Sequence, residues 1–103
     1  MDERISAELE IVARTRDWVR EHFLYMRPEW RLEIDDQLLR NGVIDSIGVV
    51  ELVAWLTDAF AITVDEAEYT EHNLGSLGAI AAFVERKRRS VGPPEAGRPR
   101  HVA

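Results

Sequence analysis

The sequence predicts an all-α domain with four helices, three of them longer and one short. The chain has 103 residues with 46% hydrophobic content, which suits one domain with a modest core. Apolar residues recur at three- and four-residue spacings in three separate stretches, as they do along amphipathic helices. A brief acidic segment before the last stretch suits the first turn of a short helix. We therefore expect a helical domain at residues 1–89 and a disordered tail at residues 90–103.

The first helix is expected over residues 3–24, because one face of that stretch is apolar. Arg16 interrupts the apolar face, and we expect Thr15 to take its place there. Pro28 marks the end region, since the residue before a proline disfavours helical backbone. The apolar positions follow three-, four- and seven-residue spacings: Ile5, Leu9, Val12, Val19 and Phe23.

A long connection follows over residues 25–45, and its apolar content predicts that it is ordered. Its apolar side chains would gain free energy by packing onto the helices, which argues against disorder. We expect a short turn near residues 36–39 and a flexible backbone point at Gly42. The apolar side chains of the connection are Tyr25, Trp30, Leu32, Ile34, Leu38, Leu39, Val43 and Ile44.

The second helix is expected over residues 46–60, with a buried stripe on one side and polar or small residues on the other. Trp55 is the unusual member of the polar side, either a partly packed edge residue or a contact for a partner. The buried stripe consists of Val49, Leu52, Val53, Leu56 and Phe60. The opposite side carries Gly48, Glu51, Trp55 and Asp58.

Two further helices are expected after a short extended stretch at residues 61–64. The acidic residues 65–68 would form the first turn of a brief third helix, which residues 73–75 end. Ser76 is the expected N-cap of the last helix, and the basic residues 86–89 suit its C-terminal end. The apolar face of this last helix consists of Leu77, Ile80, Ala81 and Val84.

Composition argues against several classes of function. No run of about 18 apolar residues is present, so we expect no membrane span. The N-terminus lacks the apolar stretch of a signal peptide, and a cytoplasmic location is the expectation. The chain has no cysteine, which excludes disulfides, thiolate chemistry and cysteine-based metal sites, and we expect no metal site.

Charge is distributed unevenly along the chain, whose net charge is −6. Residues 33–71 contain ten acids and a single base, Arg40. Such a field repels phosphate backbones and attracts basic protein surfaces. We therefore interpret the basic run at residues 86–89 as a solvated helix end and expect no nucleic-acid partner.

Ser46 follows Asp45 at the start of the second helix, and three interpretations of this serine are open. Helix geometry alone favours an N-cap. A catalytic nucleophile needs a base, and the histidines at 22, 72 and 101 lie in other segments, with no G-x-S-x-G elbow around the serine. The third interpretation is covalent modification through a phosphate, which free backbone N–H groups and the helix dipole would accommodate. An enzyme that uses Ser46 is therefore disfavoured.

The wider sequence around Ser46 resembles the acyl carrier protein family over about residues 5–88. Asp45-Ser46-Ile47 is close to the family's D-S-L, and Glu51-Leu52 follows five and six residues later. The likeness continues through Leu56, Phe60, Ile62, Val64, Asn73-Leu74, Ser76-Leu77 and Ile80. It implies a right-handed four-helix bundle with one short helix. It also implies that a phosphopantetheinyl transferase, using Mg²⁺, moves 4′-phosphopantetheine from coenzyme A to Ser46, with Asp45 as an adjacent recognition residue.

The resemblance further implies a monomeric, stand-alone carrier that catalyses nothing itself and holds acyl or aminoacyl groups as thioesters. A loading ligase and downstream acyl-transfer or synthase enzymes would be its partners, in fatty-acid, polyketide, nonribosomal-peptide or another specialised synthesis. Gly48, Val49 and Thr57 stand where fatty-acid carriers often have acids, which favours a specialised pathway. The alternative is an unmodified acidic helical adaptor that binds a basic protein. By position, partners would meet Ile47, Gly48, Val50, Glu51, Ala54, Trp55 and Asp58.

Overall fold

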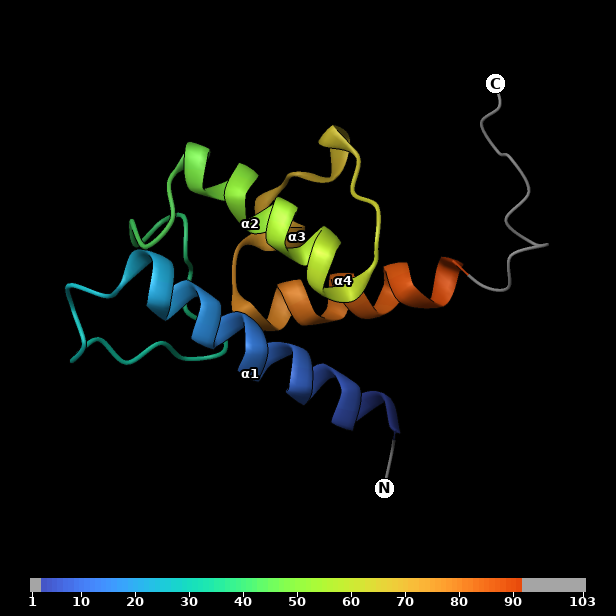
Figure 1. Ribbon diagram of the computed structural model, residues 1–103, viewed down its shortest axis with the longest axis horizontal. Coiled ribbons are helices and arrows are strands. Elements are labelled where there is room, and N and C mark those ends of the chain that lie inside the picture. The colour runs from blue at the N-terminus through green and yellow to red at the C-terminus, as the bar shows by residue number, and fades with distance from the viewer. Residues whose placement is uncertain (1–2, 92–103) are drawn as a thin grey trace.

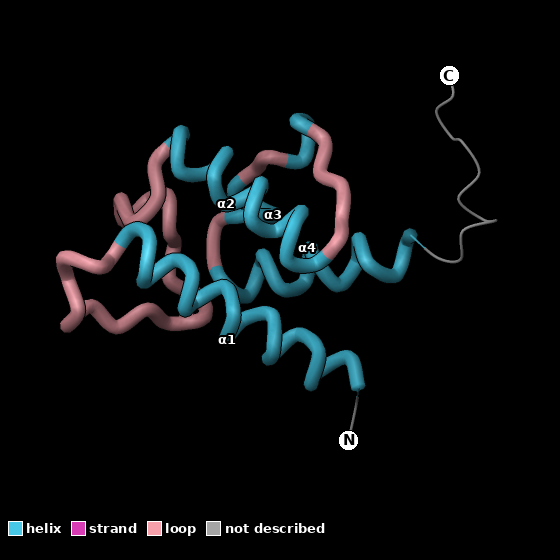
Figure 2. The backbone as a smooth tube through the Cα atoms, in the orientation of Figure 1, coloured by secondary structure: helices cyan, strands magenta, loops and turns pink. Residues whose placement is uncertain are grey.

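Within residues 3–91 the chain forms four α-helices and one 3₁₀ helix, and Figures 1 and 2 show how these elements are arranged. The computed structural model describes the backbone of residues 3–91 and the side chains of residues 6–89. None of the described residues forms a β-strand, so the all-α prediction is confirmed. No helix within residues 3–91 combines the length and the hydropathy needed to cross a bilayer. In chain order the elements are α1 (Glu3–Phe23), α2 (Ser46–Phe60), the 3₁₀ helix η1 (Glu66–Glu68), α3 (Glu71–Leu74) and α4 (Leu77–Val91).

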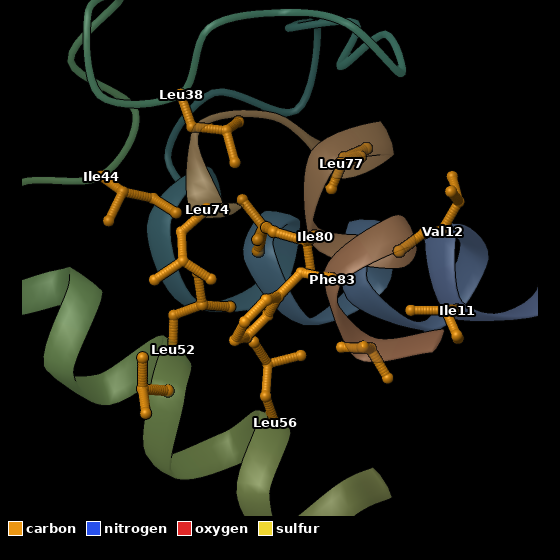
Figure 3. Close-up of a cluster of buried hydrophobic side chains, with 14 of the residues drawn as sticks. Ile11, Val12, Leu38, Ile44, Leu52, Leu56, Leu74, Leu77, Ile80 and Phe83 are labelled. Carbon is orange, nitrogen blue, oxygen red and sulfur yellow. The ribbon is translucent and has the colours of Figure 1, made fainter. Parts of the chain in front are cut away.

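Helix α4 is the element around which the other three helices pack. Helices α1, α2 and α3 each contact α4. Figure 3 shows Leu52 and Leu56 of α2 pointing toward Ile80 and Phe83 of α4, across the middle of the domain. All four of these side chains are at most 2% exposed. Because burying such a side chain stabilises a fold by about 1.5–3 kcal/mol, this contact contributes much of the helix packing.

The buried face of α1 differs in one position from the expected one. Ile11, Val12 and Val19 are buried, and Thr15 is buried in place of Arg16 as expected. Leu9, in contrast, is 59% exposed. Leu9 precedes Ile11 by two residues, which places it about 200° around the helix from Ile11 and away from α4. Its assignment to the apolar face was therefore wrong, and the side chain of Ile5 lies outside the described ones.

Arg16 and Arg20 explain the polar interruption of α1. Nε of Arg16 donates a hydrogen bond to the carbonyl oxygen of Leu32 at 2.9 Å. The guanidinium of Arg20 donates to the carbonyl oxygens of Trp30 and Pro28, the latter at 2.9 Å. Charged donors make stronger hydrogen bonds than neutral ones. The two arginines therefore fasten the first part of the connection onto α1.

The second part of the connection is fastened to the junction between α3 and α4. The backbone N–H of Leu38 donates to the carbonyl oxygen of Gly75 at 2.7 Å, and that of Gly78 donates to Ile34 at 2.8 Å. A turn forms where expected, since the N–H of Asn41 donates to the carbonyl of Gln37 at 2.9 Å. The prediction of an ordered connection is confirmed by its buried members, which are Leu32, Leu38, Val43 and Ile44. Tyr25 and Ile34 are exposed instead, at 70% and 43%.

The expected third helix is divided into two short elements. The acidic segment forms η1, in which the backbone N–H of Asp65 donates to Oε1 of Glu68 at 2.9 Å. A separate helix, α3, then begins after Thr70, whose Oγ1 accepts from the backbone N–H of Asn73 at 3.2 Å. Extended backbone at Thr70 interrupts the helix and allows this second cap to form. The expectation of one continuous helix from residue 65 was therefore wrong, and Asn73 belongs to α3.

Helix α4 begins as the sequence indicates. Oγ of Ser76 accepts a hydrogen bond from the backbone N–H of Ala79 at 3.1 Å, which is the expected cap. The helix continues to Val91, beyond the boundary expected at residue 89. Residues 92–103 of the expected tail lie outside the described residues. The apolar face is buried as predicted, with Leu77, Ile80, Ala81 and Val84 all at most 1% exposed.

Candidate functional site

The chain reaches Ser46 through a tight turn, and the two residues of this turn that precede Asp45 are buried. Gly42 has φ +76°, a backbone conformation that glycine adopts without strain. Val43 and Ile44 are then 6% and 1% exposed, and both of their N–H groups donate to the carbonyl of Leu38, at 2.9 and 3.2 Å. The residue two positions before Ser46 is thus fixed in the core.

Asp45, and not Ser46, caps helix α2. Oδ1 of Asp45 accepts a hydrogen bond from the backbone N–H of Gly48 at 2.7 Å, and the backbone of Asp45 is extended. Ser46 is the first residue with helical backbone. A carboxylate accepts a stronger hydrogen bond than a hydroxyl does, so the aspartate takes the capping position. The interpretation of Ser46 as the N-cap was therefore wrong.

Ser46 consequently presents a free hydroxyl at the surface. Its side chain is exposed. Among the described residues, its hydroxyl makes no hydrogen bond, and none therefore joins it to His22 or His72. The start of a helix also offers a phosphate the positive end of the helix dipole. An exposed hydroxyl at this position can accept a phosphodiester.

Gly48 is buried beneath the turn that carries Ser46. A Cβ atom at this position would lie 2.9 Å from Cγ2 of Ile44 and 2.9 Å from Cε1 of Phe23, the last residue of α1. The bare backbone of Gly48 therefore lets the first turn of α2 pack directly against the end of α1. The expectation that Gly48 lies on the polar, partner-facing side of α2 was wrong, because the side of the helix that carries it faces Phe23.

The other residues expected on the partner-facing side lie at or near the surface. Ile47 and Val50 are 73% and 55% exposed, which is high for large apolar side chains. Trp55 is half-buried and stacks on Trp18 of α1, with ring centroids 5.3 Å apart and an interplanar angle of 14°. It is thus a partly packed edge residue, the first of the two interpretations of its position. The exposed members of the set are Ile47, Val50, Glu51, Ala54 and Asp58.

A groove lies beside this exposed surface, and we did not anticipate it from the sequence. It has a volume of about 750 Å³ and runs between α2 and the segment that follows it. The segment turns back toward α2 at Ala61, which has φ 56° in the left-handed region. The sequence signal that could have indicated this groove was a stripe of α2 residues at three- and four-residue spacings from Ser46. The groove is lined by Val50, Val53, Ala54, Thr57 and Asp58 of α2 and by Ala61, Thr63, Val64 and Tyr69.

The structure shows a small helical domain with the exposed Ser46 hydroxyl at the start of α2. The sequence family described as "Phosphopantetheine attachment site" matches residues 24–84, more than half of the chain and including Ser46. The chain therefore belongs to this family of acyl carrier proteins, as the resemblance predicted, and it carries a covalent 4′-phosphopantetheine.

A curated relative adds a more specific likeness. The D-alanyl carrier protein of Streptococcus suis (strain 98HAH33) is 37% identical over 51 residues, which are 50% of this chain. The matched part spans 65% of the length of that relative. The likeness covers a carrier domain and supports a carrier role for this chain.

Proposed function

We propose that Ser46 is the attachment point of the arm and that the protein carries aminoacyl groups on it as thioesters. The observation that supports this most is the exposed Ser46 hydroxyl, which Asp45 leaves free by taking the capping role itself. The group at this position can react without breaking a hydrogen bond that holds the helix start. Attachment therefore leaves the cap of α2 in place.

The attachment step is a phosphoryl transfer carried out by a separate transferase. Oγ of Ser46 forms a bond to the phosphorus that bears the pantetheine of coenzyme A. The bond from that phosphorus to the oxygen bridging it to the second phosphate breaks, and 3′,5′-bisphosphoadenosine leaves. The hydroxyl proton of Ser46 passes to a base of the transferase, and Mg²⁺ in that enzyme balances the phosphate charge. This chain supplies the nucleophilic oxygen and a fixed turn around it.

An aminoacyl cargo is the proposal that the comparison with known proteins favours. The relative named above is a D-alanyl carrier protein. We therefore expect an adenylating ligase to load this chain and a downstream acyl-transfer or synthase enzyme to unload it. In this proposal Ser46 is the reacting group that the chain contributes.

The exposed side of α2 is the proposed docking surface for these enzymes. It combines the apolar side chains of Ile47 and Val50 with the carboxylates of Glu51 and Asp58. The surrounding residues 33–71 contain ten acids and one base, a field that attracts basic protein surfaces. A partner that presents apolar side chains ringed by lysine or arginine matches this surface best.

Intact-mass measurement after incubation with coenzyme A and a broad-specificity transferase tests the attachment. The wild-type chain should gain the mass of one phosphopantetheinyl group, and Ser46→Ala should gain none. Ser76→Ala is the matched control, because it also removes a serine hydroxyl at a helix start and should still be modified. A wild-type chain that remains unmodified with several transferases would refute the proposal and favour an unmodified acidic adaptor.

A further inference from the structure

The groove beside α2 opens on the same side of the helix as Ser46. With 3.6 residues per turn, positions separated by three, four, seven or eleven residues share one side of a helix. Val50, Val53 and Thr57 stand four, seven and eleven residues after Ser46, and all three line the groove. A group attached to Ser46 can therefore enter the groove without crossing the helix.

The length of the groove along α2 matches the length of a phosphopantetheine arm. At 1.5 Å per residue, Val50 lies about 6 Å and Asp58 about 18 Å along the helix axis from Ser46. An extended chain advances roughly 1.1–1.2 Å per bond, so the about fourteen bonds from the serine oxygen to the thiol sulfur span roughly 16 Å. The amine of an aminoacyl group on that sulfur lies three bonds further, roughly 19–20 Å from the serine oxygen. Its reach is therefore within about 2 Å of the position of Asp58 along the helix axis.

The groove lining offers both apolar and hydroxyl-bearing side chains to the arm. The branched dimethyl carbon of the arm comes about four bonds after the serine oxygen, roughly 5 Å along, where Val50 and Val53 offer an apolar wall. The two amides follow at roughly 8 and 12 Å, and Thr57, Thr63 and Tyr69 are the hydroxyl-bearing residues that line the groove. Hydroxyl groups both donate and accept hydrogen bonds, as amides require.

Asp58 stands at the far end of this groove with an exposed carboxylate. Within the described part of the chain, no arginine, lysine or histidine forms an ion pair with it. An unpaired carboxylate attracts an ammonium group and offers nothing specific to an uncharged acyl group. The end of the groove therefore distinguishes cargo by charge.

We infer that the groove holds the arm and that Asp58 binds the ammonium group of an aminoacyl cargo, so that the carrier distinguishes aminoacyl from plain acyl groups. This inference rests on the proposed attachment at Ser46. An exposed ion pair favours the docked arrangement by a factor of about 1.4 to 5. Salt screens exposed charges, so high ionic strength should reduce this factor.

Two cargoes that differ in one group test the role of Asp58. Alanyl and isobutyryl groups have nearly the same shape, but the first carries an ammonium where the second carries a methyl. Coenzyme A analogues that bear either group through a stable amide can be attached to Ser46 by the transferase, and intact mass verifies loading. Backbone amide chemical shifts measured by NMR then report which residues each cargo contacts.

The alanyl form should shift the amides of Thr57, Asp58 and Thr63 more than the isobutyryl form does, and high salt should reduce the difference. Asp58→Asn should remove the difference, with a loss of docked population of about 1.4- to 5-fold. Glu66→Gln is the matched control, because it removes one exposed acid close to the groove but outside its lining. It should leave the difference unchanged.

Three outcomes would count against the inference, and they differ in meaning. Equal shifts for both cargoes, or a difference that survives Asp58→Asn, would overturn the role of Asp58. Loaded protein without shifts in the groove residues would show that the arm stays in solvent, which overturns the groove itself. A wild-type chain that gains no mass would refute the proposed attachment, and the inference would fail with it.

Discussion

Gly48→Ala tests how tightly the serine-bearing turn packs onto the end of α1. The added Cβ would lie 2.9 Å from Cγ2 of Ile44, 2.9 Å from Cε1 of Phe23 and 3.1 Å from Cζ of Phe23. Favourable contacts between carbon atoms begin at roughly 3.5 Å, so the neighbours have to move by about half an ångström. Ile44 is only 1% exposed and cannot turn into solvent. The Phe23 ring or the turn itself must therefore shift.

Two opposing effects set the size of the change. Alanine is more favourable than glycine inside a helix by about 1 kcal/mol. Adding a methyl group to a filled core costs about 1–3 kcal/mol. The free energy of unfolding of Gly48→Ala should therefore be lower than that of the wild type, by up to about 2 kcal/mol.

Urea unfolding followed by tryptophan fluorescence measures this change, and Gly78→Ala is the matched control. Position 78 also lies in a helix, but a Cβ there would be 3.3 Å from Cγ1 of Ile34, which is 43% exposed and can move aside. The control should keep the helix-propensity gain, so that the two variants differ by about 1–3 kcal/mol. If Gly48→Ala is as stable as Gly78→Ala, the close packing against Phe23 is wrong.

The remaining predictions concern the core and one ion pair. Leu56→Ala should lower the free energy of unfolding by about 2–5 kcal/mol, and a loss below about 0.5 kcal/mol in urea would contradict the burial of Leu56. Thr15→Val should leave stability unchanged or raise it by about 1 kcal/mol, because its buried Oγ1 has no partner among the described residues; a clear loss would mean that the hydroxyl is bonded. The backbone N–H of Asp65, and to a lesser extent Lys87, lower the pKa of Glu68. The ionised Glu68 carboxylate therefore stabilises the fold fully at pH values above the ordinary glutamate pKa of about 4.3. This contribution is lost as the pH falls through the lowered pKa of Glu68. The stability advantage of wild type over Glu68→Gln in urea should therefore shrink on acidification, and an advantage that is constant with pH would disprove this coupling.

The helices were predictable because their apolar patterns are strong. Helix α2 runs over the expected residues 46–60, and its Leu52 and Leu56 face the core as their spacing indicates. The buried face of α1 was harder, since Leu9 stands three residues before Val12 and Ile11 four residues before Thr15, so both spacings are helical. Which of the two side chains is buried depends on the position of α4, and that position is set by the tertiary structure. Single-sequence periodicity does not contain it.

The identity of the site residues was predictable from the sequence, but their geometry was not. Asp45 and Ser46 are both good capping residues, and the sequence offers no way to see which of them has helical backbone. The role of Gly48 depends on the approach of Phe23, which stands far from it along the chain. The groove depends on the left-handed turn at Ala61, a conformation that the residue type does not suggest.

Localising the attached group by peptide mass spectrometry tests the central claim most directly. Cleavage after Arg40 and Arg86 releases the peptide from Asn41 to Arg86, which contains Ser46 and Ser76 as its serines. After treatment with coenzyme A and a transferase, fragmentation should place one phosphopantetheinyl group on Ser46. A group found on Ser76, or on any residue other than Ser46, would contradict the account even if the intact mass had increased as expected.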